Sequence, residues 1–296
     1  MRYAVIADRV DSRNVTSTSL ASGIQQFVIG LAQKMLLANT VAVPVDRIFA
    51  LSPDELTMSM AWLGAIGYAL QIYFDFGGYS NMAIGLGRIL GFELPRNFDR
   101  PYAAQSVTEF WRRWHITLSN WFRDYVYIPL GGNRHGPGRT GANLLTVFFL
   151  CGFWHGASWN FAIWGLYHGL FLILERLGLG RLVATASRPL RHAYLLLVVV
   201  IGWVPFRADT LATTLAYLRA MAGLGTASGP ALPAQLTNLV ALAMLVGIVA
   251  ATWPRPDPRI FQDWANARQL ACLTLFVLSA ASLVAGTHNP FIYFRF

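Results

Sequence analysis

The fold is decided most clearly by residues 143–175, which read NLLTVFFLCGFWHGASWNFAIWGLYHGLFLILE. This stretch is apolar almost throughout, yet it contains two histidines, His155 and His168. A side chain that titrates near neutral pH is costly to place at membrane depth, so such a residue is a functional candidate. The other interpretation is a histidine at a helix end that bonds to a neighbouring backbone carbonyl, and the stretch by itself leaves both open.

The composition of the whole chain is typical of a membrane protein. Of its 296 residues, 55% are hydrophobic and only 12% are charged, whereas soluble domains carry about 25% charged residues. The apolar runs have helical length and do not alternate as strands do. We therefore predict an all-α, polytopic transmembrane helical bundle with about 7–9 membrane or interfacial helices. The net charge of +9 indicates loops beside anionic lipid and not nucleic-acid binding, because no nucleic-acid motif accompanies it.

Apolar residues at helical spacing predict the individual elements. We expect a first helix over residues 19–38, breaks at Pro44 and Pro53, and a span over residues 56–74 that ends at Asp75. The remaining expected elements are two helices divided near residues 156–158, spans over 193–206, 235–253 and 270–286, a weaker amphipathic helix over 209–221, and loops over 226–233 and 254–258.

Residues 88–139 form a strongly basic connecting region. Eight arginines stand against four acidic residues there, a balance of +4. Arginine-rich connections favour the cytoplasmic side of a membrane. We therefore predict a single integral-membrane domain over residues 1–296, with residues 88–139 as its cytoplasmic-side basic region.

One interfacial helix is expected inside this basic region. Ser106 and Glu109 have the spacing of a capping box, and an apolar run of helical period follows them. One stripe of that helix is aromatic and the other is polar, which suits a membrane interface or the wall of a polar cavity. The polar stripe consists of Arg112, His115, Ser119 and Arg123.

Three clusters of residues could carry chemistry: Asp75 with its neighbours, the polar stripe, and His155 with His168. Asp75 could instead end a helix at the surface, and the polar stripe could be a solvated face. If His115 and His155 meet in the bundle, a histidine there can act as a general base towards a hydroxyl group. Nearby arginines can hold an anionic donor.

Cys151 lies four positions before His155, so a helix would place both on one face. This spacing permits a Cys–His nucleophile pair. The favoured interpretation is a cysteine that packs as a small buried hydrophobe, so we expect no acyl group on Cys151. No metal site is expected, since the chain has no metal-ligand spacing.

Three segments closely resemble the membrane-bound O-acyltransferase (MBOAT) family, in the branch of the alginate O-acetyltransferase membrane subunit. They are DFGGYSNMAIGLGRILGFELPRNFDRPY, EFWRRWHITLSNWFRDYVYIPLGGNR and GFWHGASWNFAIWGLYHG. GWVPFRA at residues 202–208 and NPFIYFRF at residues 289–296 are also similar to that branch. The resemblance covers nearly the whole chain, and ordered motifs of this length are specific.

The resemblance implies a multi-pass O-acetyltransferase of the bacterial inner membrane. It would pass an acyl group from a cytoplasmic donor, acetyl-CoA, towards hydroxyls of an exported, alginate-like polysaccharide, with no bound cofactor. The polysaccharide or a periplasmic SGNH-type acetyltransferase would be its partner. The family's WHG histidine falls on His155, the expected general base or proton relay, and its RRWH histidine falls on His115. The expected supporting or substrate-binding residues are Asp75, Arg112, Arg113, Ser119, Arg123, Trp154 and His168.

The sequence also departs from the family pattern. Asn81 stands where an aspartate is usual and Gly77 where a serine is usual, so no acid–base role is expected at position 81. Family members have several more spanning helices before the region that matches residue 19 onward, which implies an N-terminally truncated chain.

Other interpretations remain open. Within enzymes, the alternative is a D-alanyl or longer-acyl transferase of the same fold. Outside them, the alternatives are a proton-coupled transporter and a non-catalytic scaffold of a polysaccharide export complex. A transporter predicts inverted repeats, and the sequence shows no such symmetry.

Overall fold

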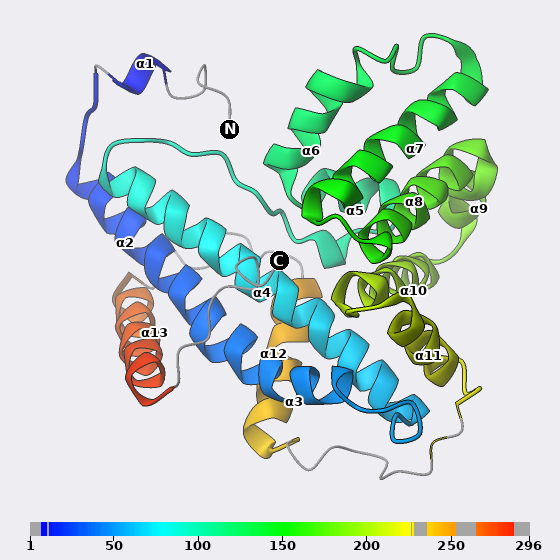
Figure 1. Ribbon diagram of the computed structural model, residues 1–296. Coiled ribbons are helices and arrows are strands. Elements are labelled where there is room, and N and C mark those ends of the chain that lie inside the picture. The colour runs from blue at the N-terminus through cyan, green and yellow to red at the C-terminus, as the bar shows by residue number, and fades with distance from the viewer. Residues whose placement is uncertain (1–6, 11, 226, 228–235, 253–264, 287–296) are drawn as a thin grey trace. The chain divides into compact units, whose positions relative to one another are not determined.

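A computed structural model describes residues 7–10, 12–225, 227, 236–252 and 265–286. These residues form helices and connecting turns without any strand, which confirms the all-α prediction (Figure 1). The predicted loop over 254–258, most of the loop over 226–233 and the motif over 289–296 lie outside the described residues. Within the described ranges, four helical segments are long and apolar enough to cross a membrane: Ser17–Phe49, Trp159–Thr185, Arg188–Arg207 and Asn266–Ala285.

The chain groups into two compact units. The first comprises the described residues within 1–42, 70–97 and 238–295, and the second those within 43–69 and 98–237. The helix α4, Met58–Ile89, contributes to both units. The single integral-membrane domain stays a prediction.

The helices of the first unit, besides α4, are α1 (Ala7–Val10), α2 (Ser17–Ala32), the π-helical turn η2 (Gln33–Ala38), the start of α3 (Asn39–Phe49), α12 (Asn238–Thr252) and α13 (Ala265–Ala285). In sequence order, the helices of the second unit that follow α4 are η3 (Pro101–Ala103), α5 (Val107–Arg113), α6 (Ile116–Phe122), η4 (Arg123–Tyr127), α7 (Gly136–His155), α8 (Trp159–Leu174), η5 (Glu175–Leu179), α9 (Gly180–Thr185), α10 (Arg188–Arg207) and α11 (Leu211–Met221).

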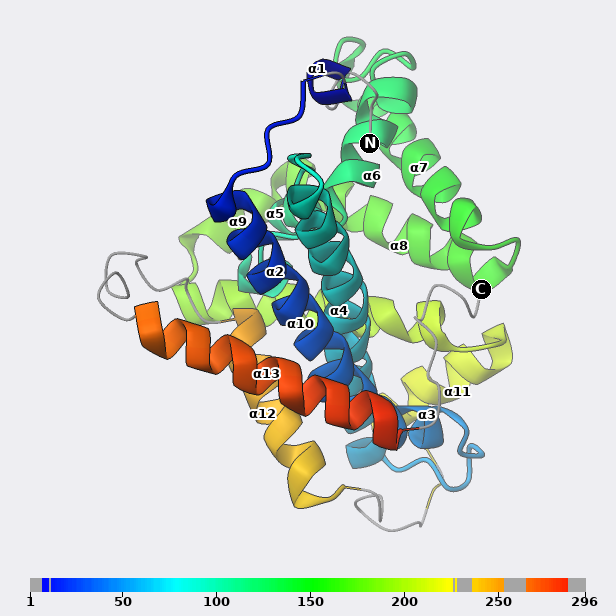
Figure 2. The same cartoon turned by 90° about the vertical axis from the view of Figure 1, so that its left-hand side faces the viewer.

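Glycines bring α2 into close contact with the second half of α4. A Cβ atom added at Gly30 would lie 2.5 Å from the carbonyl oxygen of Gly78, and one at Gly23 would lie 2.8 Å from that of Gly85. Small residues permit this approach between helices. In the same unit, α13 packs across α2 and η2 (Figure 2).

Polar side chains are paired along the same helix contact. The Lys34 ammonium donates to Asp75 Oδ2 over 3.0 Å, and both residues are buried. The Gln26 amide donates to Asn81, and the Asn81 amide donates to Gln33. An isolated charge would be costly at this depth, so the pairing is what allows these residues inside the unit.

Two predicted helix ends are wrong. Pro44 lies inside α3 and does not break it; a bundle tolerates such a proline because local π-helical turns and neighbouring groups satisfy the freed backbone. The helix over residues 56–74 does not end at Asp75, and Asp75 is not at the surface, since α4 continues to Ile89. Because Lys34 neutralises the Asp75 carboxylate, α4 can continue through this buried position.

The two helices expected within residues 143–175 are confirmed as α7 and α8, with the break after His155. They pack side by side in the second unit (Figure 1). A Cβ atom added at Gly165 would overlap the carbonyl oxygen of Phe148, and one at Gly152 would overlap that of Phe161. This close contact positions His155 relative to α8.

The other predicted helices are found with shifted ends. The expected spans over 193–206 and 270–286 correspond to α10 and α13. The expected span over 235–253 corresponds to α12, of which 15 residues, Asn238–Thr252, lie in the described part of the chain. In the second unit, α10 packs on α5 and α8, and α11 packs on α10.

Candidate functional site

The helix expected from residue 106 onward is broken at His115, so that prediction is wrong in this respect. α5 ends at Arg113 and α6 begins at Ile116. His115 between them has a φ of 44°, in the left-handed region that a non-glycine residue rarely adopts. The helical repeat is interrupted there, so the predicted aromatic and polar stripes are not continuous. Strained backbone of this kind is found most often at functional sites.

The start of α5 is fixed by capping. The Ser106 hydroxyl accepts a hydrogen bond from the Glu109 N–H over 3.0 Å, as the capping-box spacing predicts. The reciprocal bond differs, because the Glu109 carboxylate accepts from the N–H of Gln105. Only one of the two hydrogen bonds of a capping box therefore forms, and this bond sets where α5 begins.

Glu175 also holds the N-terminus of α5, a role that is not evident from the sequence. Its buried carboxylate accepts from the Val107 N–H over 2.6 Å and from the Thr108 N–H over 2.9 Å. The hydroxyls of Thr108 and Tyr194 donate to it as well. A carboxylate at a helix N-terminus satisfies unpaired N–H groups and stabilises the helix dipole. The only available signal was an acidic residue that closes a long apolar stretch.

His155 is the last residue of α7 and lies half-buried in a wall of aromatic rings. Its ring centroid is 4.9 Å from that of Trp154, 5.3 Å from Trp164 and 5.0 Å from Phe206. Trp164 and Phe206 meet the imidazole nearly edge-on, at 88° and 75°. These rings come from α8 and α10, so three helices shape the surroundings of one histidine.

The structure brings His115 and His155 to one place. The ring of Trp154 contacts both, with its centroid 6.3 Å from that of His115. Burial is the main cause that lowers the pKa of His115 from 6.5 to about 3, and the nearby His155 is the next cause. His115 is therefore neutral at physiological pH. Trp154 itself is 55% exposed, so the described residues leave one side of this contact uncovered.

The lowered pKa of His115 also has a consequence for stability. The unfolded chain takes up a proton near pH 6.5, whereas the folded chain resists it until about pH 3. This group therefore imposes no penalty above pH 6.5 and destabilises the fold as the pH falls below that value.

His168 lies behind the same wall. It is fully buried on α8, and among the described residues neither of its ring nitrogens has a hydrogen-bond partner. Its ring centroid is 5.0 Å from Trp111 and 5.4 Å from Trp164. Trp164 also contacts His155, so the ring of Trp164 lies in contact with both histidines. Neither Trp164 nor Phe206 was expected at the site.

The predicted arginines lie in different settings. Arg112 is exposed and, within the described part of the chain, has no ion-pair partner. Arg113 is half-buried and bonds to Glu109 one turn earlier. Arg123 is exposed and pairs with its neighbour Asp124 over 2.8 Å. Of the three, Arg112 is the one whose guanidinium is available to a ligand.

The last two predicted supporting residues are Ser119 and Asp75. The Ser119 hydroxyl donates to the carbonyl oxygen of Trp114 over 3.3 Å, across the break at His115. Asp75 belongs to the first unit, where it pairs with Lys34. Ser119 thus makes a structural hydrogen bond close to His115 in the sequence. Asp75 forms a buried ion pair with Lys34 in the first unit.

The fold and site define a helical membrane protein with two histidines that meet at an exposed tryptophan. The chain matches the model of the membrane-bound O-acyltransferase family over residues 2–218. It belongs to that family.

The chain is also similar to individual proteins, over the whole of its length in one case and over part of it in two others. It is 40% identical to "Probable alginate O-acetylase AlgI" of Pseudomonas putida, over 100% of this chain and 65% of that protein. It is 41% identical to "Peptidoglycan O-acetyltransferase" of Helicobacter pylori, over 71% of this chain and 40% of that protein. It is 31% identical to "Teichoic acid D-alanyltransferase" of Streptococcus thermophilus, over 56% of this chain and 42% of that protein. The chain thus spans slightly less than two thirds of the length of the Pseudomonas putida relative.

Proposed function

We propose that this chain acts in the bacterial inner membrane as an O-acetyltransferase. It passes an acetyl group from acetyl-CoA on the cytoplasmic side towards hydroxyls of an exported, alginate-like polysaccharide. The observation that carries the proposal is the meeting of His115 and His155 at Trp154. The names of two relatives, which describe O-acetylation of alginate and of peptidoglycan, support the same class of acceptor.

The chemistry requires one proton acceptor beside the reacting hydroxyl. His155 takes the hydroxyl proton as the oxygen attacks the thioester carbonyl carbon. The carbon–oxygen bond forms, the carbon–sulfur bond breaks, and the leaving sulfur takes the proton back from His155. His115 is neutral and can relay the proton or orient the hydroxyl. Arg112 is available to the phosphates of the donor.

The acceptor at the far side of the membrane has two forms under this proposal. The acetyl group goes either to the polysaccharide itself or to a periplasmic SGNH-type acetyltransferase that makes the final transfer. Both accept the acetyl group on oxygen, so the step at His155 is the same.

Labelled donors test the proposal directly. Membranes of the source bacterium should transfer label from acetyl-CoA to oxygen esters, and membranes lacking this chain should not. The relative named as a D-alanyltransferase favours D-alanine as a second candidate acyl group, so a D-alanyl thioester is supplied in parallel. Transfer of D-alanine but not of acetyl would replace the acetyl proposal, and equal acetyl transfer without the chain would refute it.

The cytoplasmic placement of residues 88–139 has its own test. Arg134 is exposed, so an introduced Arg134→Cys should react with a membrane-impermeant thiol reagent. The parent for this variant carries Cys151→Ala and Cys272→Ala, since these are the two cysteines of the chain. We expect labelling in inverted vesicles and none in intact spheroplasts. Labelling of intact spheroplasts would reverse the predicted orientation.

A further inference from the structure

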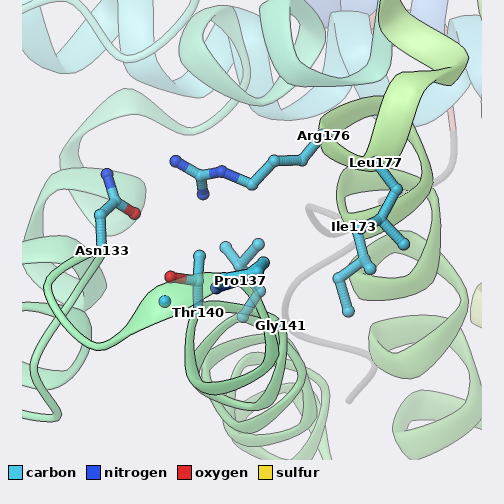
Figure 3. Close-up of a pocket in the computed structure, with 9 residues that line it drawn as sticks. Asn133, Pro137, Thr140, Gly141, Ile173, Arg176 and Leu177 are labelled. Atoms are coloured by element: carbon cyan, nitrogen blue, oxygen red, sulfur yellow. The ribbon is translucent and has the colours of Figure 1, made fainter.

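A cavity of about 280 Å³ opens beside the N-terminal end of α7. Asn133, Thr140 and the Arg176 guanidinium line one end of it, and Ile173 and Leu177 line the other (Figure 3). An α-helix rises about 1.5 Å per residue, so the cavity lies roughly 20 Å along α7 from His155. It is therefore separate from the histidine site.

Three polar groups point into one end of the cavity. The guanidinium of Arg176 and the carboxamide of Asn133 face the same space, and the hydroxyl of Thr140 borders it (Figure 3). Thr140 is only 3% exposed, and it lines the cavity. A ligand oxygen at this end could accept a hydrogen bond from that hydroxyl.

The first turn of α7 adds unpaired N–H groups to this end. Gly136 and Pro137 line the cavity, and the N-cap residue His135 makes no side-chain capping bond. Pro137 has no N–H group, so of these two residues only Gly136 can donate one. No acidic side chain lies in that turn. A long helix whose N-terminus lacks a cap presents N–H donors and partial positive charge to an anion.

The surrounding charge is also positive. No acidic residue occurs between Asp124 and Glu175. Asp124 is paired with Arg123, and Glu175 is bound to the start of α5. Arg176 has no carboxylate partner within the described residues; its recorded bond is to the hydroxyl of Tyr127, over 3.4 Å. This end of the cavity therefore favours an anion.

The other end of the cavity is apolar. Ile173 and Leu177 lie within Trp159–Thr185, a segment long and apolar enough to cross a membrane. Leu177 is 69% exposed. A ligand that fits both ends must join an anionic group to hydrocarbon, and the available molecule of that kind at a membrane span is a lipid.

We propose that this cavity binds an anionic phospholipid. The phosphate oxygens accept hydrogen bonds from Arg176, from the Thr140 hydroxyl and from the first N–H groups of α7. The acyl chains lie along Ile173 and Leu177. Arginine suits this contact because its planar guanidinium binds phosphate through two donors.

The test measures lipid binding to the full chain, purified and placed in nanodiscs of phosphatidylcholine. A fluorescent phosphatidylglycerol is titrated into the nanodiscs, and its contact with the protein is followed by energy transfer from tryptophan. Arg176→Gln should weaken binding by about 10-fold or more, since it removes a charge-assisted hydrogen bond. Thr140→Val keeps the side-chain shape and should weaken binding by several-fold.

Arg181→Gln is the matched control. Arg181 is exposed on α9 and does not line the cavity, so this variant should bind within two-fold of the parent. Equal weakening by Arg176→Gln and Arg181→Gln would overturn the site, because it would show general attraction to a charged surface. Unchanged binding in both Arg176→Gln and Thr140→Val would overturn it as well.

A second experiment distinguishes a bound lipid from a bound soluble phosphate ester. Adenosine 3′,5′-bisphosphate is added as a competitor at increasing concentration. We expect it not to displace the lipid below millimolar concentration, since it cannot occupy the apolar end. Displacement at micromolar concentration that depends on Arg176 would replace the lipid with a soluble phosphate ester and refute the proposal.

Discussion

His155→Ala should lower acetyl transfer by about 10²–10⁴-fold, the contribution typical of a positioned general base. The side chain lies at the end of α7 in contact with Trp154, which also contacts His115. Removing it takes away the proton acceptor and leaves the aromatic wall of Trp164 and Phe206 in place. The measurement is ester formation from labelled acetyl-CoA in membranes, normalised to the amount of inserted chain.

Cys151→Ala provides the control on the same helix, one turn before His155. Cys151 is buried, so the substitution removes a small apolar group together with the only thiol near the histidine along α7. We expect most activity to remain and no acyl thioester to be trapped on this residue. Near-normal transfer by His155→Ala would contradict the role of His155, and loss of transfer in Cys151→Ala would point to a thiol intermediate.

Gly165→Ala should separate α7 from α8 and remove most activity. The new Cβ atom would overlap the backbone carbonyl oxygen of Phe148, which cannot move without shifting α7. Overpacking of this kind costs about 1–3 kcal/mol in free energy of unfolding. The same shift displaces Trp164 from His155. Thermal unfolding of the solubilised chain, together with the transfer assay, measures both effects.

Gly138→Ala makes the same substitution at a position where the added Cβ atom has space. Nothing lies within 4 Å of a Cβ atom added at Gly138, in the first turn of α7. An alanine in a helix is more stable than a glycine by about 0.5–1 kcal/mol. We expect an unchanged or slightly raised unfolding temperature. If Gly165→Ala behaved like Gly138→Ala, the close contact between α7 and α8 would not be what positions His155.

Local patterns in the sequence were sufficient for the class of fold and for part of the site. Apolar runs of helical length predict an all-α membrane bundle, and the glycine and serine after His155 predict the division between α7 and α8. The placement of His115 and His155 on family motifs predicts that they act together. These features depend on residues close in sequence or on a motif, so they can be recognised without the fold.

Tertiary contacts decided what local patterns could not. α4 passes through Asp75 because Lys34, 41 positions away, neutralises its carboxylate. α5 begins where it does partly because Glu175, 68 positions after Val107, accepts its N–H groups.

The break at His115 is a further case of the same kind. A continuous amphipathic pattern runs through residues 106–125, yet His115 in its middle has a left-handed backbone, and its ring contacts that of Trp154, 39 positions away. In each of these cases the partner is distant in sequence. The energy of burying a charge, an unpaired N–H group or a large ring is set by that partner, so only the folded chain determines it.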